Sequence, residues 1–73
     1  MITVHYTRPT GLRRTYEVTY DYWCYQIRFE GELRKHGAVP QLVQGAPLTR
    51  EEQAGLGLAW AKRDIDGLVG MDE

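Results

Sequence analysis

The segment YEVTYDYWCYQIRF, residues 16–29, restricts the fold more than any other part of the chain. Its large side chains occupy even positions up to Tyr22 and odd positions from Trp23 onward. Side chains alternate between the faces of a strand, so a change of parity requires a bulge or a second strand. Asp21 favours a turn, but the next two residues are poor turn formers without glycine. We therefore favour one long bent strand, or two strands meeting at a kink, over a hairpin, with large rings on both faces.

The neighbouring segments also have strand character. Residues 2–7 alternate β-branched or aromatic side chains with polar ones, which predicts a half-buried strand. The sequence RPTG at 8–11 predicts a turn, after which a second strand begins near residue 14 or 15. Glycine in EGE, residues 30–32, predicts a hairpin turn with a return strand over 33–36.

A helix is expected over residues 50–66. Thr49 and Glu52 have the spacing of a capping box, and Gly67 is the expected C-terminal cap. The acidic tail 68–73 is expected to fray. An apolar stripe at helical spacing should pack on the sheet: Ala54, Leu58, Ala61, Ile65 and Leu68.

These elements predict a single α+β domain over residues 1–73. Strands over about 2–36 and a loop over 37–48 precede the helix, which gives an antiparallel sheet of three to four strands with one C-terminal helix packed on one face. A 73-residue domain buries only about 60% of its unfolded surface. Because Cys24 is the single cysteine, no internal disulfide supplements that core, and a partner chain becomes more plausible.

The chemistry-bearing residues do not form a catalytic or metal-binding pattern. His5, Cys24 and His36 lack the short paired spacings of zinc sites, and no nucleophile or phosphate-loop motif is present. Asp64 and Asp66 are two residues apart on a helix, so their carboxylates diverge. We expect no enzymatic activity, no cofactor and no metal.

The N-terminal stretch MITVHYTRP alternates in polarity, which is unlike a signal peptide. The sequence has no run of about 18 apolar residues, the minimum for a membrane span. We expect a cytoplasmic protein without a membrane partner.

Leu56 and Trp60 lie four residues apart, roughly opposite the apolar stripe of the helix. With Arg63 they resemble an interface ridge, since Trp and Arg are enriched in binding hot spots. Alternatively, the 37–48 loop or the tail covers Trp60. The expected second aromatic face adds Tyr22, Trp23 and Tyr25 to the partner-binding residues.

Strand 2–7 is also a candidate interface, because it contains no proline and His5 is its one basic or acidic residue. Unprotected edge strands recruit further strands, including those of an identical chain. The favoured partner is therefore another protein or a second copy, giving a homodimer.

Nucleic-acid binding is the alternative, because basic residues accompany the rings and both can contact a single strand. Acidic residues on the same strands, such as Glu17 and Asp21, would repel phosphates and disfavour this function. A third alternative is a structural subunit of a larger assembly. The basic candidates are Arg13, Arg14, Arg28, Arg34 and Lys35.

Two stretches, YQIRFEGELRKHG and PLTREEQAGLGLAWAKRDID, carry a resemblance in layout. An aromatic and arginine-bearing strand, a glycine hairpin, a return strand and a helix opened by T-x-E-E follow one another over about residues 22–66. This region resembles short uncharacterised proteins of proteobacteria and their phages, accessory products of mobile elements. The resemblance implies a β-hairpin-plus-helix fold and a binding role, such as inhibition of a host protein.

Overall fold

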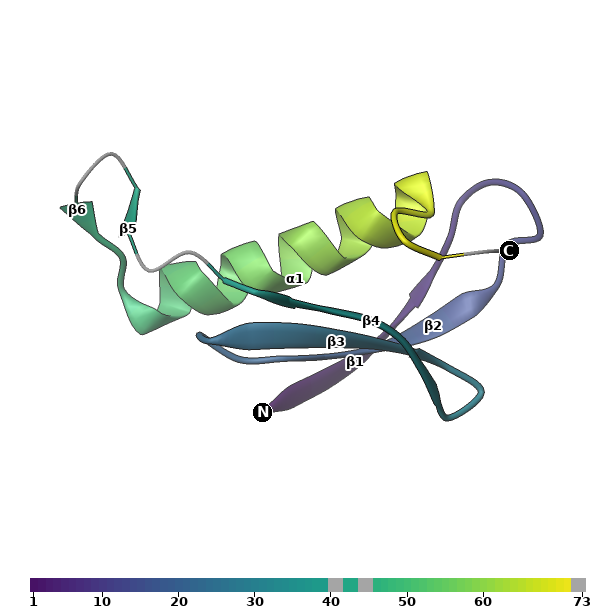
Figure 1. Ribbon diagram of the computed structural model, residues 1–73, viewed down its shortest axis with the longest axis horizontal. Coiled ribbons are helices and arrows are strands. Elements are labelled where there is room, and N and C mark those ends of the chain that lie inside the picture. The colour runs from purple at the N-terminus through teal and green to yellow at the C-terminus, as the bar shows by residue number, and fades with distance from the viewer. Residues whose placement is uncertain (40–41, 44–45, 72–73) are drawn as a thin grey trace.

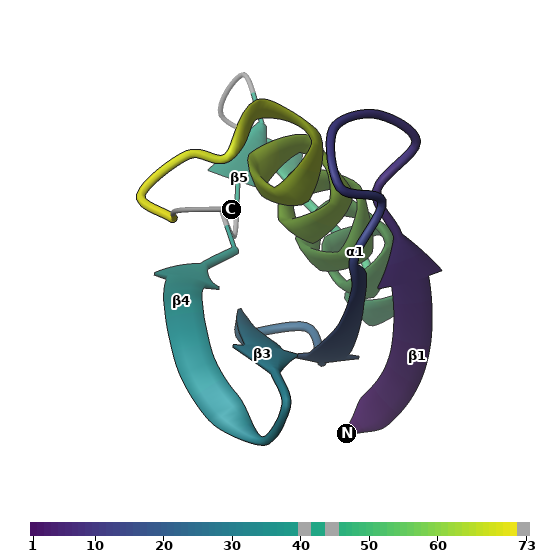
Figure 2. The ribbon, with the colours of Figure 1, turned by 90° about the vertical axis from the view of Figure 1, so that its right-hand side faces the viewer.

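The computed structural model describes residues 1–39, 42–43 and 46–71, and it has the expected α+β fold. Four antiparallel strands form a sheet in the order β1-β2-β3-β4, and α1 packs across one face (Figure 1). Figure 2 shows the sheet curving beneath the helix, with β1 and β4 at its two edges. The main elements are β1 (Ile2–Thr7), β2 (Thr15–Tyr20), β3 (Cys24–Phe29), β4 (Glu32–Ala38) and α1 (Arg50–Gly67).

Residues 16–29 form a hairpin, so the predicted bent strand is wrong. β2 pairs with β3, and Tyr20 lies opposite Tyr25. The Oδ1 atom of Asp21 accepts hydrogen bonds from the backbone N–H groups of Trp23 at 2.7 Å and Cys24 at 2.9 Å. This local capping holds the turn, and φ is not positive at either residue between Asp21 and Cys24. Glycine is therefore unnecessary here.

The turn also explains the change of parity. Residues 21–24 separate the paired positions 20 and 25, so the large residues of both strands face the helix. Tyr16, Val18 and Ile27 are buried there. The expectation of rings on both faces is wrong, because the opposite face carries mainly polar side chains. These are Thr3, His5, Thr7, Thr15, Glu17, Thr19, Gln26, Arg28 and His36.

The predicted turn at residues 30–32 is confirmed, with φ of 52° at Glu30 and 80° at Gly31. The return strand is longer than expected and reaches Ala38. A Cβ atom added to Gly37 would lie 2.6 Å from Cζ of Tyr25, so only glycine leaves room for the ring above β4.

The predicted loop over 37–48 contains regular structure at three places. The strand β4 extends into it, and the short strands β5 (Leu42–Val43) and β6 (Ala46–Pro47) pair with each other. Positions 40–41 and 44–45 of that prediction lie outside the described residues.

Both ends of α1 are capped. The predicted capping box is confirmed, since the N–H of Glu52 donates to Thr49 Oγ1 and the N–H of Thr49 donates to Glu52 Oε1, each at 3.1 Å. Hydrogen bonds to the Glu52 carboxylate from the backbone N–H of Thr49, and then from its side chain, lower the pKa of Glu52. The left-handed C-terminal cap is Leu68, with φ of 52°, and the predicted cap at Gly67 is one residue early.

The buried face of α1 is rotated from the predicted apolar stripe toward Trp60. Ala61 and Ile65 are fully buried as expected, but Gly57 and Asp64 are buried with them. Leu56 and Trp60 are half-buried and pack against the core, so they do not lie wholly on the solvent side of the helix as expected. A Cβ on Gly57 would lie 3.1 Å from Val39 Cγ2, which shows how closely the helix backbone approaches its neighbours.

The described part of the tail returns to the core. Gly70 has φ of 71° and lies close to the aliphatic stem of Lys35, and Met71 is buried. Fraying is therefore wrong as far as residue 71, and positions 72–73 lie outside the described residues.

Candidate functional site

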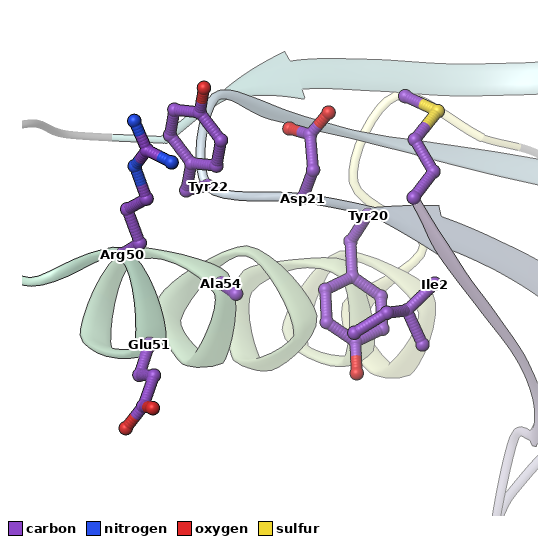
Figure 3. Close-up of a pocket in the computed structure, with 8 residues that line it drawn as sticks. Ile2, Tyr20, Asp21, Tyr22, Arg50, Glu51 and Ala54 are labelled. Atoms are coloured by element: carbon purple, nitrogen blue, oxygen red, sulfur yellow. The ribbon is translucent and has the colours of Figure 1, made fainter.

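An apolar groove lies where β1 and α1 both begin, at the end of the molecule that carries the β2–β3 turn (Figure 3). Its volume is about 380 Å³. The Arg50 guanidinium lies 4.7 Å from the centre of the Tyr22 ring, within the range of a cation–π contact. The lining residues are Met1, Ile2, Tyr20, Asp21, Tyr22, Arg50, Glu51 and Ala54.

The β2–β3 turn presents Trp23 beside this groove. The Trp23 side chain is 57% exposed, and its ring centre lies 5.7 Å from that of Tyr22. Hydrogen bonds from the backbone of Cys24 and Trp23 lower the pKa of Asp21. The ionised Asp21 carboxylate therefore favours the turn conformation that carries both rings.

The outer edge of β1 is the second component of the site. β1 pairs with β2 in an unbroken register from Ile2 opposite Tyr20 to Thr7 opposite Thr15. The N–H of Arg8 donates to the carbonyl of Arg14, which marks that position as a hydrogen-bonded pair.

Hydrogen-bonded and non-bonded pairs alternate in antiparallel sheets. The even residues of β1 therefore bond β2, and Thr3, His5 and Thr7 direct their backbone N–H and C=O groups outward. Ile2, which is 52% exposed, belongs both to this strand and to the groove, so the edge and the groove are continuous.

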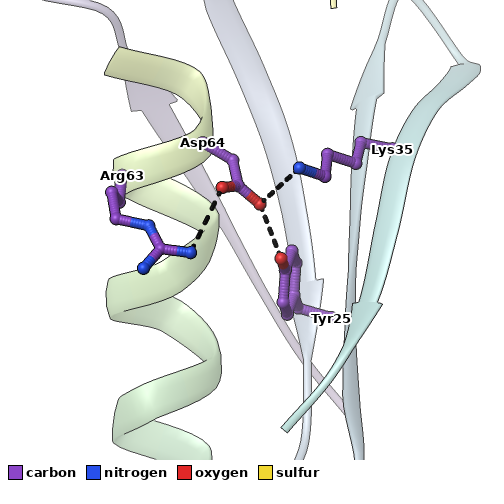
Figure 4. Close-up of polar contacts among 4 residues, drawn as sticks. All are labelled: Tyr25, Lys35, Arg63 and Asp64. Carbon is purple, nitrogen blue, oxygen red and sulfur yellow. Dashed lines mark hydrogen bonds and ion pairs between the residues drawn. The ribbon is translucent and has the colours of Figure 1, made fainter. Parts of the chain in front are cut away.

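Tyr25, a predicted partner-binding residue, is instead buried and holds the helix on the sheet (Figure 4). Its hydroxyl donates to Asp64 Oδ2 at 2.5 Å, and Lys35 Nζ lies 3.2 Å from the same oxygen. Asp64 is 1% exposed, and Arg63 Nη2 lies 3.6 Å from its Oδ1. Burial raises the pKa of Tyr25 to about 12, with further contributions from the hydrogen bond and the charge of Asp64. Tyr25 and Lys35 therefore have structural roles.

Arg8, which sequence reasoning did not select, binds the C-terminal end of the helix. Its Nε donates to the carbonyl of Ile65 at 3.1 Å and its Nη2 to that of Asp66 at 3.1 Å. Tyr6 donates to Asp66 Oδ1 at 2.7 Å, and this bond raises the Tyr6 pKa. The signal in the sequence is indirect: no basic residue occupies the last turn of α1, so its carbonyls need a cation from elsewhere.

The other predicted partner-binding residues lie away from the groove. Leu56 and Trp60 follow the flank of α1 opposite Lys62 and Asp66, and the Arg63 guanidinium is 5.2 Å from the Trp60 ring centre. This flank contributes to the core more than to an open surface.

The predicted basic residues are dispersed and partly engaged. Arg14 and Arg34 approach one ring, that of Phe29, at 5.1 and 5.8 Å. Arg28 donates to Gln26 at 2.7 Å on the polar face, whereas Arg13 lies in the β1–β2 loop. Of the five predicted basic residues, the structure therefore brings two, Arg14 and Arg34, together at the Phe29 ring.

Within the described ranges, no three His, Cys, Asp or Glu side chains are close enough to hold a metal ion. The same part of the chain has no helix with the length and apolarity required to cross a membrane. Comparison with protein-family models, curated proteins and solved structures finds no match to the chain.

Proposed function

We propose that the protein is a non-catalytic protein-interaction module that binds an extended segment along β1. The observation that carries this proposal is the continuity of two surfaces at Ile2: a regular strand edge and an apolar groove. In strand addition, backbone hydrogen bonds supply affinity and side-chain pockets supply specificity. The edge has the outward-facing groups for the first, and the groove accepts an apolar side chain for the second.

The resemblance of residues 22–66 to accessory proteins of proteobacterial mobile elements supports a setting for this module. In that setting the module acts in the cytoplasm of a bacterial host, and its partner is a host protein or another copy of the chain. Binding alone is sufficient for such a role, since an inhibitor acts by occupying a surface.

The test is selection of peptides from a displayed random library on the full chain, followed by affinity measurement by fluorescence anisotropy. His5→Pro removes an outward-facing N–H, a position at which edge strands tolerate proline. Ala38→Pro is the matched control on the other edge, because the bond from Val39 N–H to the Trp23 carbonyl directs the Ala38 N–H outward as well. Ala54→Phe fills the groove.

We expect the selected peptides to bind wild type and Ala38→Pro and to lose affinity for His5→Pro. Peptides with an apolar anchor should also lose affinity for Ala54→Phe. Equal binding to all four proteins, or a selection that yields no peptide, would contradict the proposal.

A nucleic-acid-binding function is the second candidate, favoured by the convergence of Arg14 and Arg34 on Phe29. It predicts that affinity for a single-stranded oligonucleotide falls steeply with salt. The double variant Arg13→Glu, Arg14→Glu should abolish that binding, whereas His5→Pro should not change it.

A further inference from the structure

We infer that the segment that pairs with β1 is β1 of a second copy of this chain, which joins two sheets into one continuous sheet. This inference rests on the proposed function, because it uses the same strand edge. A two-fold axis passes between His5 of one copy and His5 of the other, and Thr3 of one copy lies opposite Thr7 of the other.

The outward-facing backbone groups of β1 are self-complementary in this arrangement. Thr3, His5 and Thr7 are the residues whose N–H and C=O groups point away from β2. An antiparallel pairing centred on His5 places each of them opposite another residue of the same set. A register centred on Val4 pairs only Thr3 with His5 and leaves Thr7 outside.

The side chains match as well. Because positions of equal parity face each other, Val4 lies opposite Tyr6 of the second copy on the helix-covered face. On the polar face, Thr3 lies opposite Thr7 of the second copy, and these small side chains leave room for close approach. Helices of both copies then lie on the same side of the joined sheet.

The absence of Asp, Glu, Lys and Arg from β1 favours pairing of two copies through β1 over pairing through β4. β1 carries no Asp, Glu, Lys or Arg, so the pairing places no permanently charged side chains opposite each other. β4 carries Glu32, Arg34 and Lys35 and contains an irregularity of register, features that oppose strand addition.

The test is the mass of the full chain in solution, measured by sedimentation over a range of concentrations, for wild type, His5→Lys and Ala38→Lys. In His5→Lys the introduced ammonium group lies beside Glu17 within each copy, since residues 5 and 17 are paired. Across the two-fold axis it faces its equivalent. Ala38→Lys adds the same charge to an exposed position of the other edge.

We expect wild type and Ala38→Lys to dimerise, and His5→Lys to dimerise at least about tenfold more weakly because like charges oppose each other. Amide exchange provides a second measurement that needs no variant: protection at Thr3, His5 and Thr7 should rise with wild-type concentration. A wild-type monomer at all concentrations, or equal dimerisation of His5→Lys, overturns the inference.

These outcomes are separable from those of the proposed function. If wild type is a monomer but the selected peptides still require an intact β1 edge, the second copy is rejected and strand addition is retained. If neither peptides nor a second copy engage β1, both are rejected.

Discussion

The two edges of the sheet, β1 and β4, differ in how well they are protected against pairing with a further strand. Each edge strand has outward-facing backbone N–H and C=O groups to which another strand could hydrogen-bond. β4 has an irregular register and charged side chains, whereas β1 is regular and contains no Asp, Glu, Lys or Arg. β4 therefore has features that disfavour strand addition, and β1 lacks them.

The edges also differ in how they are tied to the helix. On the β4 side, Lys35 and the neighbouring Tyr25 bind the buried Asp64. On the β1 side, Tyr6 binds the exposed Asp66. Buried ionic contacts are costly to break, and exposed ones contribute little. We expect changes near β4 to lower the free energy of unfolding and changes near β1 to have smaller effects.

The largest effect is expected for Asp64→Ala. Its removal leaves the Lys35 ammonium and the Tyr25 hydroxyl without their buried acceptor, and we expect a loss of about 3 kcal/mol in the free energy of unfolding. Asp66→Ala, two residues away on the β1 side, should lose about 0.5 kcal/mol. Urea denaturation of both variants measures the difference. Equal losses would remove the contrast between the two sides.

Gly37→Ala should have the next largest effect. The added methyl group would overlap the Tyr25 ring, and overpacking of this kind costs about 2 kcal/mol. Gly55→Ala is the matched control, because no atom lies within 4 Å of the added Cβ, and alanine should stabilise the helix by about 0.5–1 kcal/mol. Thermal unfolding should therefore shift in opposite directions. A neutral result for Gly37→Ala would mean that the Tyr25 ring can leave its position above β4.

Local patterns in the sequence predicted most of the fold. The capping box of α1 and the glycine turn after β3 depend on few neighbouring residues, and both were correct. The β2–β3 hairpin was disfavoured from the sequence because the Asp21 side chain takes the place of the glycine expected in such a turn. Stabilisation of the turn by Asp21 depends on the geometry of its side chain, which residue type alone does not determine.

The face of the helix was misjudged for a different reason. An aspartate in a helix is expected to face solvent, because burial of a carboxylate without partners is unfavourable. Asp64 is therefore not expected on the buried face. Its partners Tyr25 and Lys35 are 39 and 29 positions earlier in the chain, so only the tertiary structure shows that burial is compensated. The groove likewise joins Ile2, Tyr22 and Ala54, residues that no local motif connects.

Tyr25→Phe should lower the free energy of unfolding by about 1.5 kcal/mol at pH 7, since Asp64 loses a buried hydrogen-bond donor. Tyr6→Phe, at the exposed counterpart on β1, should lose about 0.5 kcal/mol. The two variants thus compare a buried and an exposed tyrosine–aspartate hydrogen bond on the two sides of the sheet.

The stability contributed by Tyr25 depends on pH. The pKa of Tyr25 is raised to about 12 in the folded chain, above the value of about 10 for an unfolded chain. The stabilisation due to its neutral form is fully present below pH 10 and is lost as the pH rises toward 12. Urea denaturation between pH 8 and about 11.5 should show a steep decline in wild type and a shallower one in Tyr25→Phe. Parallel declines would mean that Tyr25 ionises equally easily in both states.

Apart from the control variants, the smallest effect is expected for Arg8→Ala, which removes the guanidinium from the C-terminal carbonyls of α1 next to β1. We expect a loss of about 1 kcal/mol, typical of a cation at a partly exposed helix end. Arg8→Lys keeps the charge but not the planar fork that reaches both Ile65 and Asp66, so it should recover only part of the stability. Amide exchange should accelerate at Val69, whose N–H closes the last turn of the helix, and remain unchanged at Ile27 in the core. If exchange accelerates equally at both, Arg8 stabilises the whole domain, and the β1 side is tied to the helix as firmly as the β4 side.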